Sequence, residues 1–155
     1  MAQFSNHREF LPDEAATNAL GVRIAPLLGP GLIIFLQGEL GAGKTTLVRA
    51  LIQALGYAGR VKSPTYPLVE LYKVSTLCLY HFDFYRFNDP QEWIDAGFRE
   101  CFDDENVCLI EWPEKAAGLL PVADMTIFLE HAATGRNAEL CAGTARGEEC
   151  LSRFQ

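Results

Sequence analysis

The chain has 155 residues, of which 49% are hydrophobic and 21% charged, and its formal net charge is −7. This composition suffices for one hydrophobic core, so we expect a single domain spanning residues 1–155. The acidic balance disfavours broad binding to nucleic acid or to a membrane surface, because such binding usually requires a positively charged face. The five cysteines form no C-x-x-C pair, and no apolar run reaches membrane-spanning length. We therefore expect a cytoplasmic protein with reduced thiols and no membrane contact.

The first third of the chain predicts two helices around one buried strand. Residues 1–11 are polar and aromatic and fit either a short edge strand or an irregular lead-in. Apolar residues recur at helical spacing over residues 12–28, before a Gly-Pro-Gly stop. Residues 32–37 are apolar without alternation, which is typical of a central strand covered on both faces. A second amphipathic helix follows over residues 44–55.

A glycine-rich segment, GELGAGKTT, joins that strand to the second helix. In the order strand, loop, helix, the pattern G-x-x-x-x-G-K-[ST] indicates a phosphate-binding loop, whose backbone N–H groups converge on an anion at a helix N-terminus. Lys44 is placed to reach the β- and γ-phosphates, and the Thr45 hydroxyl to bind Mg²⁺. The residues expected to bind the nucleotide here are Gly38, Leu40, Gly41, Ala42, Gly43, Lys44, Thr45 and Thr46.

The rest of the chain alternates strands with helices. Strands are predicted at residues 69–74, 77–82, 107–110, 125–130 and 138–142. Asp89, Pro90 and Glu92 predict a helix start, and that helix would present Trp93 or Ile94, then Phe98, Cys101 and Phe102, to the core. The residues after 142 carry no strong pattern. Together these elements predict an α/β fold with a three-layer sheet of the P-loop nucleotide hydrolase type, parallel in the centre and antiparallel at its edges.

Two acids stand where strands end. Asp83 follows a β-rich run, and Glu111 follows four apolar residues in the manner of a Walker B strand. Ligands of parallel sheets bind at the carboxyl ends of the strands, and a phosphate-binding loop needs a nearby carboxylate for Mg²⁺ and the attacking water. We therefore predict Lys44, Glu111 and Asp83 as catalytic residues, and Thr45, Glu111 and Asp83 as the metal site. Either acid alone could instead be a helix cap or a solvated residue.

Other residues near these strand ends leave alternatives open. His81 is more typical of a packed or hydrogen-bonded histidine than of a proton carrier. Trp112 could cover the site or simply pack. Ser63 to Tyr66, reading SPTY, lie where switch-type hydrolases sense the γ-phosphate. Arg60 and Lys62 could touch RNA phosphates or an acidic protein, or form a solvated basic loop.

These residues together resemble the TsaE family, also called YjeE, the bacterial ATPase that supports threonylcarbamoyladenosine modification of tRNA. The blocks that carry the resemblance are LPDEAAT, GELGAGKTT, VKSPTYPLVE, HFDFYR and LIEWPEK. The resemblance implies an ATP-Mg²⁺ site with Thr45 and Glu111 as metal ligands and Asp83 close by. It also implies that Leu11 and Arg136 lie near the nucleotide. Pro67 and the bulky segment 93–96 depart from the family pattern, away from the nucleotide chemistry.

The resemblance also implies partners. They would be the TsaD and TsaB proteins, and tRNA would be met only within that complex. ATP hydrolysis, slow without the partners, would reset the complex between turnovers, while TsaD carries out the transfer itself.

Two other functions share the phosphate-binding loop. A small-molecule kinase would transfer phosphate to a hydroxyl, but such kinases usually close an arginine-rich lid over the site, and no such segment is present here. A nucleotide-gated docking module would bind ATP with negligible turnover. A GTPase is disfavoured because no N-K-x-D motif follows a later strand.

Overall fold

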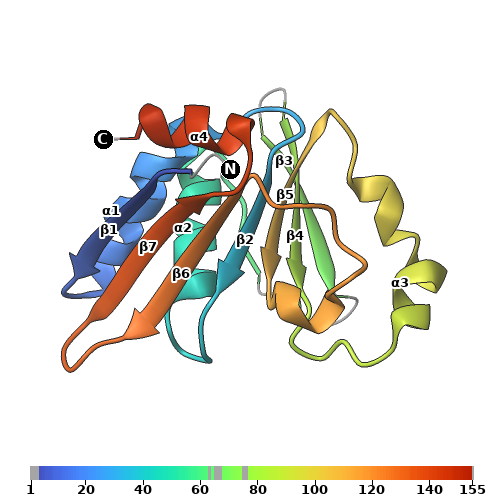
Figure 1. The fold of residues 1–155 in the computed structure, drawn as a ribbon, viewed down its shortest axis with the longest axis horizontal. Coiled ribbons are helices and arrows are strands. Elements are labelled where there is room, and N and C mark those ends of the chain that lie inside the picture. Colours follow the sequence, from blue (N-terminus) through green and yellow to red (C-terminus); the bar gives the residue numbers. More distant parts are fainter. Residues whose placement is uncertain (1–3, 63, 65–67, 75–76, 155) are drawn as a thin grey trace.

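A mixed sheet forms the centre of the molecule. The computed structural model describes residues 4–62, 64, 68–74 and 77–154, and its seven strands lie in the order β1-β7-β6-β2-β5-β4-β3 (Figure 1). The strands are β1 (Asn6–Leu11), β2 (Ile33–Gln37), β3 (Val69–Val74), β4 (Leu77–Asp83), β5 (Asn106–Glu111), β6 (Met125–His131) and β7 (Arg136–Ala142). The helices are α1 (Glu14–Ile24), α2 (Lys44–Ala54), α3 (Pro90–Ala96) and α4 (Ala145–Ser152), with single 3-10 turns η1 (Ala25–Leu27), η2 (Phe98–Cys101) and η3 (Pro113–Ala116).

The pairing of the strands confirms an α/β sheet that is parallel in its centre. β2 pairs parallel with β6 and with β5, and β5 pairs parallel with β4. β1 and β7 pair antiparallel, as do β7 with β6 and β3 with β4. The first residues of the chain thus supply an edge strand, β1, which settles the alternative between a strand and an irregular lead-in.

The sheet buries side chains on two faces. In β2, Ile34 and Leu36 join the core formed with α1 and α2, whereas Ile33 and Phe35 pack against an aromatic core on the other face. That second core includes Trp93 of α3 and Phe98 of η2. Every residue of β5 from Val107 onward is buried. Burial on both faces explains why the sequences of β2 and β5 are apolar without alternation.

One predicted helix is divided in two. Asp89 accepts a hydrogen bond from the Gln91 N–H at 2.9 Å, so the predicted cap is confirmed. The helix then stops at Ala96, because Gly97 has φ 68° and reverses the chain direction before η2. The prediction of one continuous helix was therefore wrong, but Phe98, Cys101 and Phe102 do pack in the aromatic core as expected. Trp93 is the core residue, and Ile94 is 65% exposed.

The last helix, α4, was not predicted. Thr144 caps it by accepting a hydrogen bond from the Gly147 N–H at 3.1 Å, and the Thr144 hydroxyl donates to Asp124 at 2.7 Å. The other Asp124 carboxylate oxygen accepts from the Ile33 N–H at 2.9 Å. Asp124 therefore ties α4 to the start of β2.

Gly147→Ala should destabilise the protein by about 1–3 kcal/mol, the usual cost of overpacking. Gly147 is buried, and a Cβ there would collide with the backbone carbonyl oxygen of Asp124, which is fixed between β2 and α4. This clash outweighs the gain in helix propensity of up to about 1 kcal/mol. Urea unfolding measures the effect, with the exposed Glu149→Ala of the same helix as control. Equal stability of the two variants would contradict this packing.

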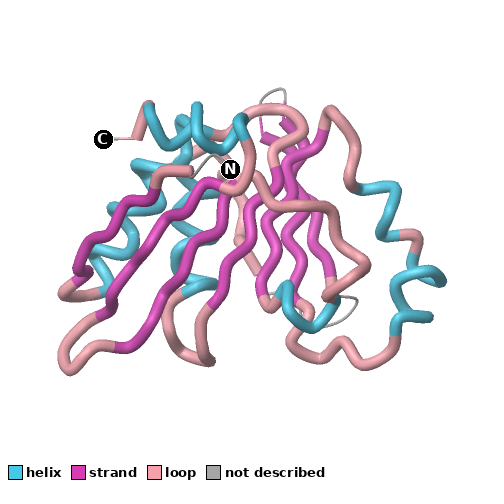
Figure 2. Tube along the Cα trace, in the orientation of Figure 1, coloured by secondary structure: helices cyan, strands magenta, loops and turns pink. Residues whose placement is uncertain are grey.

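Four connections lie at the same end of the sheet, where the parallel strands have their carboxyl ends. The connections that follow β2, β4, β5 and β6 meet at the lower edge in Figure 2, while α4 lies across the opposite end. They include the glycine-rich segment and the residues beyond Asp83 and Glu111. Among the described residues, no helix has the length and apolar character needed to cross a membrane.

Candidate active site

The glycine-rich segment turns the chain from β2 into α2. Gly43 occupies the N-cap position of α2 with φ 103°, a conformation that glycine adopts without strain, and no side chain caps the helix there. The first N–H groups of a helix have no partner within it, so this end of α2 can accept an anion. The predicted phosphate-binding loop therefore has a suitable backbone shape.

Lys44, the first residue of α2, lies folded over this loop. Its Nζ donates to the carbonyl oxygens of Gly38 and, at 3.1 Å, of Glu39. The same ammonium lies 4.3 Å from the centre of the Trp112 ring, in a cation–π contact. Trp112 directly follows β5 and has φ 58°. Burial lowers the pKa of the Lys44 ammonium. A bound phosphate would give the Lys44 ammonium a charged partner in place of these neutral carbonyl oxygens.

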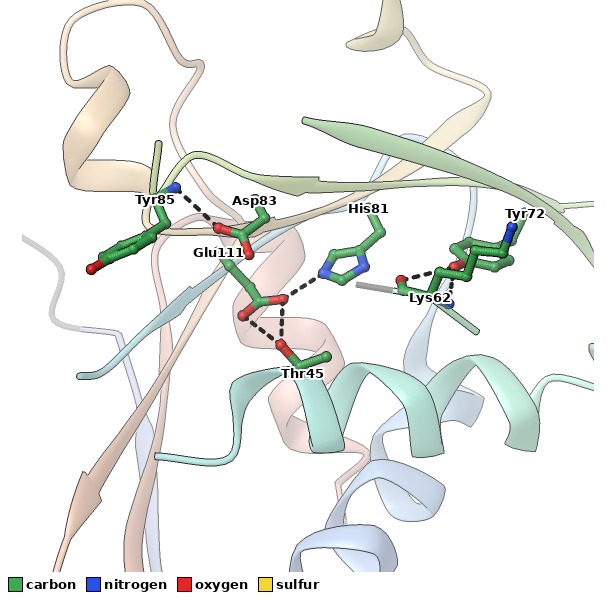
Figure 3. Close-up of polar contacts among 7 residues, drawn as sticks. All are labelled: Thr45, Lys62, Tyr72, His81, Asp83, Tyr85 and Glu111. Atoms are coloured by element: carbon green, nitrogen blue, oxygen red, sulfur yellow. Dashed lines mark hydrogen bonds and ion pairs between the residues drawn. The ribbon is translucent and has the colours of Figure 1, made fainter. Parts of the chain in front are cut away.

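Thr45 and Glu111 face one another across the strand ends. The Thr45 hydroxyl lies 3.1 and 3.2 Å from the two carboxylate oxygens of Glu111 (Figure 3). Glu111 is the last residue of β5 and is only 2% exposed. Its Oε2 also lies 2.6 Å from Nε2 of His81, which belongs to the neighbouring strand β4. The carboxylate is thus held by groups from α2 and β4.

Asp83 ends β4 beside Glu111. The two residues are direct partners in the parallel register of β4 and β5. The Asp83 carboxylate accepts a hydrogen bond from the Tyr85 N–H at 3.0 Å (Figure 3). Burial raises the pKa of the Asp83 carboxyl, and the negative charge of Glu111 adds to this shift, while the Tyr85 N–H opposes it. The charge of Asp83 is therefore unfavourable unless a cation approaches.

A cavity of about 270 Å³ brings most of the predicted site together. It is lined by Leu40, Gly41, Ala42, Gly43, Lys44, Thr45, Thr46, Asp83, Tyr85, Glu111 and Trp112. Its hydroxyl and carboxylate oxygens are the hard donors that Mg²⁺ prefers. Among the described residues there is no group of three or more histidine, cysteine, aspartate or glutamate side chains that could hold a metal alone. This donor set fits Mg²⁺, which commonly combines one or two carboxylates with phosphate oxygens and water.

A second cavity of about 280 Å³ lies on the other side of the loop and shares Gly41 to Gly43 and Thr46 with the first. Its remaining lining residues are Pro12, Asp13, Glu14, Thr17, Gly135 and Arg136. Arg136 donates to the Gly41 carbonyl oxygen at 2.9 Å, so its guanidinium reaches the loop. Leu11 pairs with Arg136 in the sheet, but its side chain is 1% exposed and belongs to the core. Leu11 lines neither of these two cavities, although its neighbour Pro12 lines the second.

Some neighbours of the site had no clear sequence signal. His131, at the end of β6, lies 3.3 Å from the Leu40 carbonyl oxygen through Nε2. Asp13 and Glu14 line the second cavity because α1 starts beside the loop. Trp112, by contrast, was expected either to cover the site or to pack; it lines the first cavity, with its ring centre 5.1 Å from that of Tyr85. Only the parallel register of β2 and β6 could have indicated that His131 reaches the loop.

The predicted switch segment is largely outside the described residues, which omit Ser63, Thr65 and Tyr66. Just before it, the Lys62 N–H donates to the buried Tyr72 hydroxyl at 2.9 Å, and that hydroxyl lies 3.2 Å from the Lys62 carbonyl oxygen. The backbone of Lys62 is therefore fixed to β3. Arg60 is exposed.

Asp83→Asn should raise the midpoint of thermal unfolding of the nucleotide-free protein at pH 7. A carboxyl whose pKa is raised by folding contributes stability below its ordinary pKa, and this contribution is lost as the pH rises through the raised value. Asparagine removes the unfavourable charge and keeps an acceptor for the Tyr85 N–H. The difference in unfolding midpoint between the variant and the wild type should become smaller as the pH falls toward 4. Scanning calorimetry tests this against Asp104→Asn at an exposed position, and a lower midpoint for Asp83→Asn would contradict the prediction.

Comparison with known proteins agrees with this geometry. A family model described as "Threonylcarbamoyl adenosine biosynthesis protein TsaE" matches residues 11–138. The chain belongs to the TsaE family. This match includes the phosphate-binding loop, Asp83, Glu111 and Arg136.

Relatives in the TsaE family match most of the chain. The tRNA threonylcarbamoyladenosine biosynthesis protein TsaE of Haemophilus influenzae is 42% identical over 151 residues, covering 94% of this chain and 96% of that protein. The protein of the same name from Bacillus subtilis is 37% identical over 121 residues, covering 78% of this chain and 74% of its own length. The crystal structure of Bacillus subtilis YdiB is similar with a TM-score of 0.83 at 27% identity, over 98% of this chain and 95% of that one.

Proposed function

We propose that this TsaE-family protein is a Mg²⁺-dependent ATPase built as a single domain of the P-loop nucleotide hydrolase type. One observation carries the proposal. A glycine-rich loop at the N-terminus of α2, a lysine, a threonine hydroxyl and two strand-end carboxylates line one cavity at the carboxyl ends of parallel strands. This combination supplies both the positive field for a triphosphate and the oxygen donors for its metal.

Each side chain has a distinct role in this proposal. Lys44 exchanges its contacts with the Gly38 and Glu39 carbonyls for phosphate oxygens. Thr45 and Glu111 hold the metal from opposite elements, α2 and β5. Asp83 lies beside Glu111 and completes the shell or orients water. Mg²⁺ would neutralise the developing phosphate charge when bound.

The second cavity is suited to the nucleoside part of ATP. It adjoins the phosphate cavity through shared loop residues, so a nucleotide can extend from one into the other. Arg136 is held over this boundary by its bond to the Gly41 carbonyl. We therefore assign nucleotide contacts to Arg136 and propose that Leu11, the neighbour of Pro12, lies near the nucleotide.

The pathway follows from the relatives. Their names assign them to tRNA threonylcarbamoyladenosine biosynthesis. We propose that this chain acts there in the cytoplasm with TsaD and TsaB, meets tRNA only within that complex, and uses hydrolysis to reset it. We also propose that turnover is slow without these partners.

The test is phosphate release from ATP with and without Mg²⁺, TsaD and TsaB. We expect slow, Mg²⁺-dependent release by the isolated chain and a faster rate with both partners. ATP binding without phosphate release under any of these conditions would indicate a nucleotide-gated docking module. Release that occurs only together with a phosphorylated small molecule would indicate a kinase.

A further inference from the structure

A buried histidine supports the carboxylate of Glu111. His81 lies in β4, has no exposed surface, and places Nε2 2.6 Å from Oε2 of Glu111 (Figure 3). Its other ring nitrogen, Nδ1, is buried and has no hydrogen-bond partner among the described residues. His81 thus contacts Glu111 of the proposed metal and catalytic site, and it lies two residues before Asp83 of the same site.

The contacts of the two ring nitrogens among the described residues favour a hydrogen on Nε2, since the Glu111 carboxylate beside Nε2 is an acceptor and Nδ1 has none there. A buried N–H without an acceptor costs more than a bare ring nitrogen, because the donor loses its bond to water without replacement. The ring therefore carries its hydrogen on Nε2 and donates it to Glu111. A short bond from a donor to an ionised carboxylate is among the stronger hydrogen bonds in proteins.

This bond distinguishes the two carboxylate oxygens of Glu111. Both lie near the Thr45 hydroxyl, Oε1 at 3.1 Å and Oε2 at 3.2 Å, but the His81 contact is made by Oε2. If Glu111 turned about its side-chain bonds, both relations would change, so the histidine bond restricts the carboxylate to one orientation. Outer groups that orient ligating carboxylates commonly change metal affinity or activity by about 10–100-fold when removed.

The geometry points to His81 as a positioning residue that holds the Glu111 carboxylate toward Thr45, in the orientation in which it would bind Mg²⁺. This inference rests on the proposed ATPase function. It predicts that the bond matters for the Mg²⁺-dependent step and not for nucleotide binding itself, since His81 does not line either cavity beside the loop. A purely structural role would predict loss of stability without a selective effect on that step.

The experiment compares His81→Leu, which removes the donor at similar volume, with His81→Gln, whose amide can still donate to Glu111. For His81→Leu we expect kcat to fall about 10–100-fold and the Mg²⁺ concentration for half-maximal tightening of ADP binding to rise by about tenfold. ADP affinity without Mg²⁺ should stay within about threefold, and His81→Gln should recover most of kcat. Calorimetric titration of ADP gives the readouts that do not depend on turnover.

Leu79→Ala is the matched control. Leu79 lies two residues earlier on β4, faces the same side and is fully buried, but has no polar atom to offer Glu111. It should lower stability and leave kcat and the Mg²⁺ requirement nearly unchanged. A second test uses Glu111→Gln, in whose background His81→Leu should cause little further loss of kcat.

Several results would overturn the inference. The first is a His81→Leu variant that needs no more Mg²⁺ than the wild type. The second is a Leu79→Ala variant whose kcat falls as much as that of His81→Leu. The third is a large further fall in kcat when His81→Leu is added to Glu111→Gln. If His81→Leu does not fold, His81→Asn replaces it, because its shorter amide falls short of the carboxylate; equal kcat for the Asn and Gln variants would then reject the positioning role. Failure of the wild-type chain to bind ADP would instead reject the proposed function.

Discussion

Lys44→Ala is expected to weaken ATP binding by about 100-fold or more, equivalent to roughly 2.7 kcal/mol. The ammonium is 5% exposed and already bonded to loop carbonyls, so a phosphate finds it preorganised at the N-terminus of α2. Hydrogen bonds between charged groups are worth about 1.5–3 kcal/mol each, and Lys44 can offer more than one to a triphosphate. Phosphate release should become undetectable at ATP concentrations that saturate the wild type.

Two companion variants separate charge from packing. Lys44→Met keeps a long unbranched side chain and removes the charge that lies over the Trp112 ring, so it should lose affinity as Lys44→Ala does. Arg49→Ala removes a positive charge from an exposed position of the same helix and should bind ATP normally. Calorimetric titration of ATP measures all three. Wild-type affinity in Lys44→Met would show that the ammonium does not meet the phosphates.

Local chemistry explains why the strand-loop-helix shape of the predicted phosphate-binding loop was predictable. The loop is continuous in sequence, and its function depends on glycines, a lysine and a hydroxyl at fixed spacing between an apolar strand and a helix. β5 was equally clear because four buried residues precede Glu111. Parallel strands then bring Asp83 and Glu111 to the same end of the sheet, where they are direct partners in the pairing of β4 with β5.

Contacts between distant segments could not be predicted in the same way. The burial of His81 was foreseeable from its apolar surroundings, but its bond to Glu111 depends on the register of β4 against β5. The break at Gly97 reflects tertiary packing of Trp93 and Phe98 in one aromatic core. The sequence of α4 carries no strong helical pattern. The helix is stabilised by its cap Thr144 and by Asp124, which is distant in sequence.

Glu111→Gln is expected to reduce kcat by about 10²–10³-fold while ATP affinity changes by less than about threefold. Glutamine keeps the size of the side chain and an oxygen near Thr45, but it removes the negative charge that would hold the metal and orient water. Binding of the triphosphate depends mainly on Lys44 and the loop N–H groups, which the substitution leaves in place. Turnover should therefore fall far more than binding.

Comparing the fall in kcat on substituting Glu111 with the fall on substituting Asp83 decides which of the two acids contributes more to catalysis. Glu105→Gln removes a carboxylate just before the other end of β5, where it is exposed, and serves as the control with wild-type kcat. Asp83→Asn measured alongside should lose less than Glu111→Gln, because only Glu111 contacts both Thr45 and His81 among the described residues. If Glu111→Gln hydrolyses ATP at the wild-type rate, the catalytic role passes to Asp83, which ends the neighbouring strand and lines the same cavity.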